Sequence, residues 1–316
     1  MQTWEKGLFV KGQALFLSHH SCRGCPDRMT RTRATAIGFV AVLLWSLLAL
    51  FTVGSSPTPP LLLNAICFSI GGTLGLVWTA TTGGLSQLRI VPLRVYAFGA
   101  FGLFGYHVLY FSALRLAPAA EAGLIAYLWP LLIVLFSGLL PGEKLHAGHL
   151  IGAALGFAGA AFIITGGGSG FDRQYLPGYV LALLCALTWS GYSVLSRRVG
   201  DAPTSSVAVF CGAAAIASWG LHFTIEETIW PQGATGWLST IGLGLGPVGL
   251  AFYVWDVGVK HGDIQLLGIS SYAAPLLSTL VLVMAGFAAP SWALAIAAAL
   301  ITGGALIAAR ASLKAV

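Results

Sequence analysis

Charge is scarce in this chain. Asp, Glu, Lys and Arg together make up 8% of its 316 residues, whereas hydrophobic residues make up 57%. Soluble domains carry about 25% charged residues on average. The composition therefore excludes a soluble protein and indicates one that lies in a lipid bilayer. Because residues 1–28 form the only long stretch outside the apolar segments, we expect no extramembrane domain with an activity of its own.

The spans also lack the motifs of several functional classes. They contain no His-x-x-x-His, no Gly-x-Ser-x-Gly and no convergent pair of carboxylates, so we expect neither an enzyme nor a bound cofactor. A sugar phosphate or nucleotide sugar would need a fixed positive charge in the binding site. No Lys or Arg lies at the deep polar positions, which disfavours these two classes of substrate. No cleavable signal peptide is evident, so the first span is predicted to be a permanent anchor.

Cysteine is sparse, with five residues in the chain. Cys67, Cys185 and Cys211 are scattered among the spans, where we expect apolar packing and no disulfide. The other two lie in residues 1–28, which we interpret as a disordered N-terminal extension. That segment places His19, His20, Cys22 and Cys25 together. Cys-x-x-Cys spacing suits zinc, but with no second cysteine pair and no fold in this segment we predict no metal site.

The apolar stretches are long enough to cross a membrane as helices. About 20 residues span a hydrocarbon core of ~30 Å. The predicted spans are 33–53, 60–80, 93–115, 119–140, 146–165, 177–197, 204–225, 234–258, 264–286 and 291–310. We therefore expect an all-α integral membrane protein with ten transmembrane helices.

The second half of the chain repeats the first. Trp45-Ser46 recurs 144 residues later as Trp189-Ser190, and the Tyr-x-x-Pro that begins at Tyr127 recurs 145 residues later at Tyr272. Five spans lie in each period, so corresponding helices must cross the membrane in opposite senses. The prediction is two inverted five-helix repeats, 29–165 and 166–316. Such repeats, with broken helices near the midplane, are typical of secondary transporters.

Basic residues define the orientation. With ten spans, fourteen of the sixteen Lys and Arg residues fall on the side of both termini, and only Arg115 and Arg173 on the other. This asymmetry places both termini in the cytoplasm. The net charge of +6 is explained by topology, so no nucleic-acid partner is expected.

Aromatic and polar residues gather at mid-depth in corresponding spans of the two halves. Aromatic residues normally lie at the membrane interfaces, so this placement needs another explanation. Either the rings pack within the bundle, or they line a cavity, which we favour for the set as a whole. The candidate lining residues are Tyr106, His107, Tyr110, Tyr127, Trp129, Trp189, Tyr253, Ser271 and Tyr272.

Two prolines are expected to break their helices. Pro130 and Pro275 lie near mid-span and lack an N–H, so each should kink its helix and free backbone carbonyls. The kinks either shape gates or merely serve packing. Pro247, in a glycine-rich stretch, is a further candidate hinge.

Two ionisable residues have open roles. His107 either couples transport to protons or is a neutral hydrogen-bonding group. Asp256 either faces the cavity, where it would also be a candidate for proton coupling, or pairs with Lys260 four residues later.

Small residues recur every four positions in the spans that end each half. The pattern comprises Gly148, Gly152, Gly156 and Ala160 in the first half, and Ala295, Ala299 and Gly303 in the second. They predict close helix packing, either within a monomer or at a homodimer seam.

These features resemble the drug/metabolite transporter superfamily, EamA branch. The resemblance covers about 29–316 and rests on the two inverted repeats, Trp-Ser in the first span, Pro130 and the Pro-Gly-Glu at 141–143. Ala288 stands where the second repeat would align with Glu143, so that acidic residue is not duplicated. Tyr-His at 106–107 and Tyr-x-Trp-Pro at 127–130 are similar to members of the branch that export aromatic amino acids.

The resemblance implies export of amino acids, aromatic ones included, across a bacterial inner membrane by alternating access. Aromatic walls suit an apolar side chain and an ammonium group, and Tyr, His and Ser donors suit a carboxylate. A multidrug or cationic metabolite exporter of the same fold is the alternative, which Asp256 facing the cavity would favour.

Overall fold

Every regular element that the structure describes is helical. The computed structural model of the chain describes residues 29–165, 172–199, 202–286 and 291–313. The first half contains α1 (Arg31–Trp45), α2 (Leu48–Gly54), α3 (Pro60–Thr81), α4 (Leu85–Leu88), α5 (Leu93–Ala100), η1 (Phe101–Gly105), α6 (Tyr106–Leu116), α7 (Ala119–Ala126), α8 (Trp129–Ser137) and α9 (Ala147–Thr165). The second half contains η2 (Arg173–Tyr175), α10 (Leu176–Ser196), α11 (Ser206–Ile225), α12 (Gly233–Leu245), η3 (Gly246–Leu250), α13 (Ala251–His261), α14 (Ile264–Ser270), α15 (Ala273–Met284) and α16 (Trp292–Leu313). The predicted extension at residues 1–28 lies outside the described residues.

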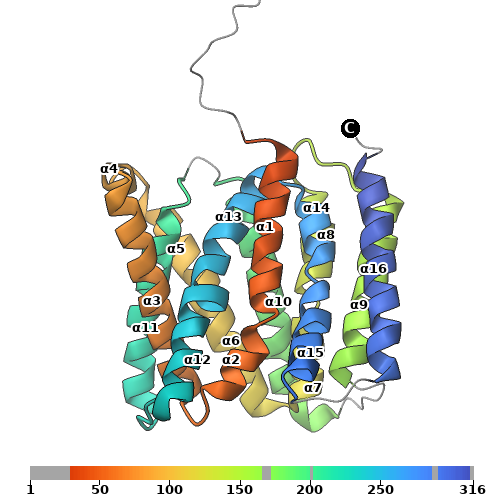
Figure 1. The fold of residues 1–316 in the computed structure, drawn as a ribbon. Coiled ribbons are helices and arrows are strands. Elements are labelled where there is room, and N and C mark those ends of the chain that lie inside the picture. The colour runs from red at the N-terminus through yellow and green to blue at the C-terminus, as the bar shows by residue number, and fades with distance from the viewer. Residues whose placement is uncertain (1–28, 166–171, 200–201, 287–290, 314–316) are drawn as a thin grey trace, which may run out of the picture.

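The long helices stand side by side, with the start of α1 and the end of α16 at the same end of the bundle (Figure 1). We call this the terminal end and the other the opposite end. Within the described residues, nine helical stretches are long and apolar enough to cross a membrane. The predicted span 119–140 is instead a shorter pair, α7 and α8, whose apolar part covers Glu121–Ser137. Large side chains such as Phe101, Ile216 and Trp292 are exposed, as expected where helices face lipid.

Both mid-span prolines lie just after a break in their helix. Pro130 is the second residue of α8, and Pro275 is the third residue of α15. The N–H groups of the first helical turn have no partner within the helix, so a proline there removes no hydrogen bond. Each interruption therefore precedes its proline. The break between α1 and α2, at Ser46 and Leu47, has no proline and was not predicted.

Two irregular helical turns recur at the interval of the sequence repeat. The π-helical turns η1 and η3 begin 145 residues apart, at Phe101 and Gly246. The same interval separates Tyr127 from Tyr272 in the sequence. A π turn accommodates an extra residue and interrupts the regular α-helical hydrogen bonds. The candidate hinge at Pro247 lies within η3, so the helix is irregular where the glycine-rich stretch predicts a soft point.

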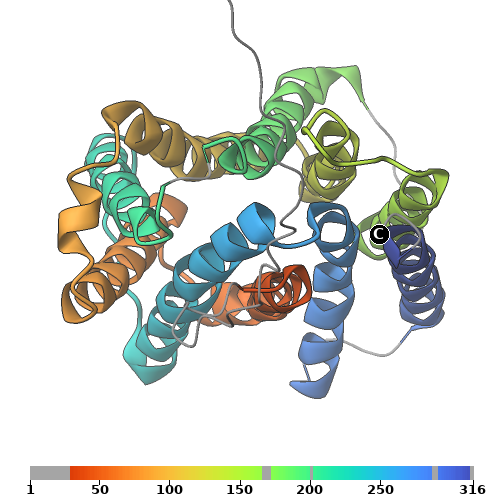
Figure 2. The ribbon, with the colours of Figure 1, turned by 90° about the horizontal axis from the view of Figure 1, so that it is seen from above.

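Small residues bring pairs of helices into close contact. A Cβ on Gly38 of α1 would lie 2.8 Å from the Cα of Gly258 in α13, and a Cβ on Gly152 of α9 would lie 2.5 Å from the carbonyl oxygen of Gly304 in α16. Figure 2 shows α9 and α16 side by side at one edge of the bundle. The glycine face of α9 therefore packs within the chain.

The corresponding face of α16 is different. Ala295 and Ala299 are exposed, whereas Ala297 and Ala308 of the same helix are fully buried. The four-residue spacing of small residues correctly predicted the contact surface of α9 but not that of α16. Because each helix has several such faces, spacing alone does not identify the one that packs.

A buried carboxylate joins three helices at the opposite end. Glu226, which follows α11, accepts hydrogen bonds from the backbone N–H groups of Leu61 and Leu62 at the start of α3. It also contacts Arg115 of α6 at 3.1 Å and the ring of His222 at 3.0 Å. A carboxylate suits the positive end of a helix, and Arg115 supplies a counter-charge. This end of α3 is thus fixed to α6 and α11.

Candidate functional site

Four tryptophan side chains meet in the core of the bundle. Trp45 ends α1, Trp129 begins α8, Trp189 lies in α10 and Trp255 in α13. Each ring contacts the other three, with centroid distances from 5.1 to 6.3 Å. Five of the six pairs meet at interplanar angles of 54° or more, the tilted and edge-to-face arrangements that aromatic rings prefer. Two rings come from each half of the chain, so the cluster lies where the halves meet.

Three predicted residues extend this tryptophan cluster along α6. The ring of Tyr106 lies 5.4 Å from that of Trp189 and stacks on Tyr110 at 6.1 Å. The ring of His107 lies 5.2 Å from Tyr106 and 5.0 Å from Phe68 of α3. These side chains of α6 remain partly exposed although they lie in the middle of a span. They therefore join the predicted Trp129 and Trp189, which are buried behind them, in one aromatic assembly that we call the aromatic surface.

Ring nitrogens of this surface bond to the π turns. Trp45 Nε1 donates to the carbonyl oxygen of Pro247 in η3 at 3.1 Å. His107 Nδ1 lies 2.7 Å from the carbonyl oxygen of Leu103 in η1. Because a carbonyl only accepts, Nδ1 carries the proton, and Nε2 of a neutral His107 is the acceptor. Each π turn thus has a carbonyl satisfied by a ring N–H in an apolar interior, where an unpaired carbonyl is costly.

Tyr127 and Tyr272 lie at the two proline-associated breaks. Tyr127 follows α7, is partly exposed, and packs with the cluster around Tyr272 and Ala160. Tyr272 is fully buried, and its hydroxyl accepts a hydrogen bond from the backbone N–H of Leu131 at 3.1 Å. The structure therefore brings Tyr272 to the first turn of α8, where an N–H group has no partner within the helix.

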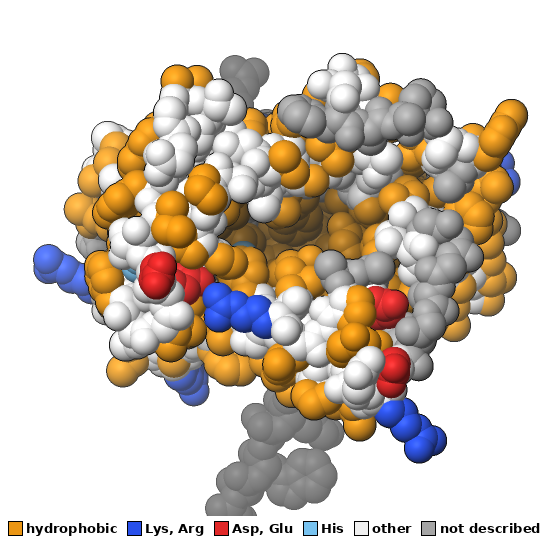
Figure 3. Space-filling view, turned by 90° about the horizontal axis from the view of Figure 1, so that it is seen from below, with side chains coloured by type: hydrophobic (Ala, Val, Ile, Leu, Met, Phe, Trp, Pro, Cys, Tyr) orange, Lys and Arg blue, Asp and Glu red, His pale blue; other side chains and the backbone are white. Residues whose placement is uncertain are grey.

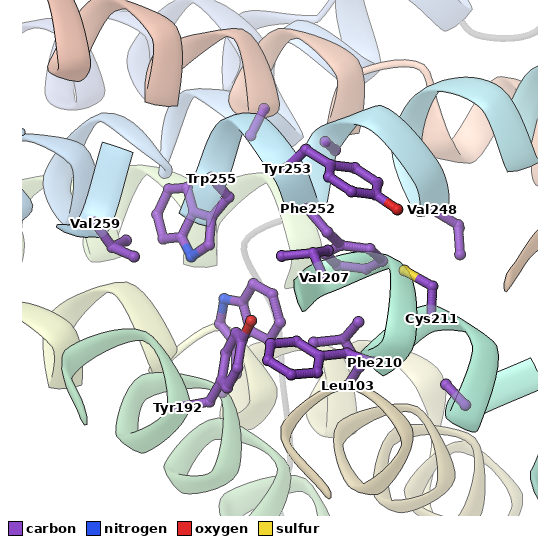
Figure 4. Packing of buried hydrophobic residues seen from close by; sticks show 14 of the residues in the cluster. Leu103, Tyr192, Val207, Phe210, Cys211, Val248, Phe252, Tyr253, Trp255 and Val259 are labelled. Atoms are coloured by element: carbon purple, nitrogen blue, oxygen red, sulfur yellow. The ribbon is translucent and has the colours of Figure 1, made fainter. Parts of the chain in front are cut away.

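The remaining predicted residues bond to backbone groups. Tyr253 Oη donates to the carbonyl oxygen of Gly71 in α3 at 2.9 Å, and Ser271 Oγ donates to that of Leu267 at 2.8 Å. Figure 4 shows Tyr253 projecting from α13 in a different direction from Trp255. The structure does not bring Tyr253 into the tryptophan cluster.

Asp256 lies in a buried ion pair. The ammonium of Lys260 is 2.9 Å from Asp256 Oδ2, and the hydroxyl of Thr204 donates to the same oxygen at 2.8 Å. Lys260 also donates to the carbonyl oxygen of Ala202. Of the two alternatives for Asp256, pairing with Lys260 is the one observed.

The two ends of the bundle differ in access. Figure 3 shows that the opposite end is hollowed at its centre, with hydrophobic side chains around the hollow. At the terminal end, Glu143 pairs with both Arg31 and Arg197, and Arg31 also lies 3.4 Å from Asp263. These residues belong to the start of α1, the α8–α9 loop, the end of α10 and the α13–α14 junction. Ion pairs therefore connect four segments at this end.

Trp45 and Trp255 belong to the cluster but were not among the predicted lining residues. Trp45 carried a usable signal, because it is the repeat partner of Trp189. Trp255 stands 145 residues after Tyr110, so its position was also marked by the repeat. The hydrogen bond from Trp255 Nε1 to Ser193 depends on the approach of α10 and has no signature in the sequence.

No group of three or more His, Cys, Asp or Glu residues within the described ranges is placed to hold a metal ion. Cys67, Cys185 and Cys211 are buried and free, which confirms their predicted packing role. The four candidate zinc ligands of the N-terminal extension, between His19 and Cys25, lie outside the described residues.

Comparison with known proteins agrees with this architecture. A curated relative from Ancylobacter novellus, named aromatic amino acid exporter YddG, is 56% identical over 283 residues, which cover 89% of this chain and 98% of the relative. The Escherichia coli protein of the same name is 26% identical over 292 residues, covering 88% and 97%. A crystal structure 55% identical in sequence matches with a TM-score of 0.87 and covers 90% of this chain and 99% of its own. The model of the EamA-like transporter family matches twice, over residues 32–165 and 176–310. The chain therefore belongs to the EamA-like transporter family.

Proposed function

We propose that this protein exports amino acids, aromatic ones among them, across a bacterial inner membrane by alternating access. The observation that carries the proposal is the aromatic surface at the junction of the two halves. Except for Trp189, which lies on the continuous helix α10, its rings come from helices that are broken or contain a π turn, as in transporters whose site lies between repeats. Two bacterial relatives named as aromatic amino acid exporters support the substrate class.

The proposed topology is ten spans in two inverted repeats, 29–165 and 166–316, with α7 and α8 together forming the fourth span. The double match to the family model and the π turns 145 residues apart support the repeat. The excess of Lys and Arg on one side supports a cytoplasmic terminal end. The hollow at the opposite end then faces outward. The aromatic surface lies within one chain, so a monomer suffices for the site, whether or not two copies associate.

In the proposed site, Tyr106, His107, Tyr110, Trp129 and Trp189 contact the substrate. Tyr127 and Trp45 complete the wall. Aromatic faces hold an apolar side chain and attract an ammonium group, each contact contributing roughly 0.5–2 kcal/mol. The free Nε2 of His107 and the tyrosine hydroxyls are the polar groups available to the head group. Weak, broad recognition follows, which suits export from a cytoplasm rich in amino acids.

The other predicted residues support this site. Tyr253, Ser271 and Tyr272 hold backbone groups in this conformation, and they become available to substrate only if those bonds break. Pro130 and Pro275 keep the α7–α8 and α14–α15 breaks in place, which lets each span bend as the cavity changes sides. Asp256 has its charge compensated by Lys260, an arrangement that favours an amino acid over a lipophilic cation as substrate.

Flux in proteoliposomes tests the proposal. Purified protein should give saturable flux of labelled tryptophan and phenylalanine that an excess of a lipophilic cation does not inhibit. Trp129→Ala and Tyr127→Ala should each lower this flux with membrane expression intact, whereas Trp292→Ala, at a lipid-exposed position, should not. Transport of the cation without amino acid flux would instead identify a multidrug exporter. Unchanged flux in both site variants would remove them from the site.

A further inference from the structure

A second cavity lies at the terminal end, away from the aromatic surface. It has a volume of about 270 Å³. Its lining residues are Arg31, Gly142, Glu143, Lys144, Asp263, Gln265 and Ser312. Apart from Gly142, every one of these residues is polar or charged. The cavity therefore differs in kind from the hydrophobic hollow at the opposite end (Figure 3).

Charges of both signs face this polar cavity. The side chains of Glu143 and Asp263 are 12% exposed, so both carboxylates lie mostly within the protein. Arg31 lies between them, 3.2 Å from Glu143 and 3.4 Å from Asp263, and is 48% exposed. Lys144 is exposed and makes no ion pair within the described part of the chain. One cation is thus shared by two acids, and a second cation has no ion-pair partner among the described residues.

The same acids close this end of the bundle. Glu143 also receives a hydrogen bond from Arg197, which in turn donates to the carbonyl oxygens of Val259 and Gly262. These contacts tie the α8–α9 loop to α10 and to the end of α13. A group that competes for Glu143 and Arg31 would weaken the connection between the first half and the second. The cavity and the closure therefore share Arg31, Glu143 and Asp263.

We propose that this polar cavity binds the zwitterionic head group of an α-amino acid as it enters from the terminal end. The ammonium group is held by Glu143 and Asp263, and the carboxylate by Arg31 and Lys144. The head group replaces the Arg31 ion pairs with equivalent ones, so binding loosens the closure. The inference rests on the proposed function, because it takes the terminal end as the side from which substrate enters.

Charge and size select this class of ligand. A lipophilic cation would be attracted by the two acids but repelled by the positive charges of Arg31 and Lys144. An anion would be attracted by those two basic residues but repelled by the two acids. A molecule that carries an ammonium and a carboxylate on one carbon satisfies all four residues. Because the lining contains no apolar side chain, the cavity reads the head group and leaves the choice of side chain to the aromatic surface.

In inside-out vesicles the terminal end faces the added substrate. Uptake into these vesicles therefore measures the apparent affinity at the terminal end. The apparent KM for labelled phenylalanine is compared between the wild type, Lys144→Gln and Glu143→Gln. Lys144 forms none of the ion pairs, so its replacement leaves the closure intact. The control is Arg198→Gln at the same end, because Arg198 bonds to the carbonyl oxygen of Leu139 and does not line the cavity.

We expect Lys144→Gln to raise KM about two- to fivefold and Glu143→Gln to raise it more, with no change for Arg198→Gln. If Glu143 served only to close this end, Glu143→Gln would open the aromatic surface to the terminal end more often, and the apparent KM would fall. An unchanged KM in Lys144→Gln together with a lowered or unchanged KM in Glu143→Gln overturns the proposal. Absence of phenylalanine flux in the wild type would instead refute the proposed function, so the two failures are distinct.

Discussion

The hydroxyl of Tyr272 accepts a hydrogen bond from the backbone N–H of Leu131 at 3.1 Å, joining two broken spans of different halves. Leu131 is the third residue of α8, so its N–H lacks a partner in its own helix. A tyrosine from the second half therefore caps a helix of the first.

Replacing this tyrosine tests the cap. Tyr272→Phe should lower the free energy of unfolding by about 1–3 kcal/mol, because it leaves a buried N–H unsatisfied. The apparent melting temperature in detergent measures the loss. Tyr175→Phe is the control, because the Tyr175 hydroxyl has no hydrogen bond in the described structure. Equal destabilisation by the two variants would contradict the capping role.

The bond from Trp45 to Pro247 predicts an effect on transport rate. Trp45→Phe keeps an aromatic ring in the cluster but removes the donor that satisfies a carbonyl of η3. We expect maximal phenylalanine flux to fall about three- to tenfold while the apparent KM changes less. Trp292→Phe, on the lipid-facing surface, should leave both unchanged. A change confined to KM would show that Trp45 acts through substrate contact alone.

His107 should act as a hydrogen-bonding group and not as the proton carrier. Its ring is surrounded by Phe68, Phe252 and Tyr106, and no carboxylate pairs with it in the described structure. A charged imidazole would therefore lack an ion-pair partner. His107→Gln should lower amino acid flux yet preserve any response to an imposed pH gradient in proteoliposomes. Loss of that response would instead make His107 the coupling group.

The Asp256–Lys260 pair should show strong coupling in stability. Asp256→Asn leaves the Lys260 ammonium buried without a counter-charge, which costs roughly 3–5 kcal/mol. Adding Lys260→Met removes that charge, so the double variant should melt at a higher temperature than Asp256→Asn alone. Additive losses in the double variant would show that the two residues act independently.

Sequence reasoning was most successful where periodicity and composition carry the information. Apolar length identified nine of the ten predicted spans as helices long enough to cross a membrane within the described residues, and the repeat, at intervals of 144 and 145 residues, identified Trp189 and Tyr272 as notable positions. The prolines marked the breaks at Tyr127 and Ser271, but the break after Trp45 has no proline and went unpredicted. At that break the hydroxyl of Ser46 donates to the carbonyl oxygen of Leu43 and the ring of Trp45 bonds to η3, and neither bond has a signature in the sequence as clear as a proline.

Direction of side chains was the main information that the sequence did not supply. Tyr253 and Trp255 are two residues apart on α13, yet Trp255 joins the tryptophan cluster and Tyr253 bonds to α3. Both residues lie at mid-depth, so depth alone did not show which of them belongs to the tryptophan cluster. The ion pairs of Glu143 likewise join residues as far apart as Arg31 and Arg197, which only the packed bundle brings together.

The π turns η1 and η3 also bear on how the chain arose. Each adds a residue to a helix at the same place in its half, at Phe101–Gly105 and Gly246–Leu250. One insertion in a half-length ancestor, followed by gene duplication, is a simpler history than two matching insertions. The irregular turn is then older than the fused protein. The two halves would then have inherited the turn together with the Trp-Ser pair that they share at 45–46 and 189–190.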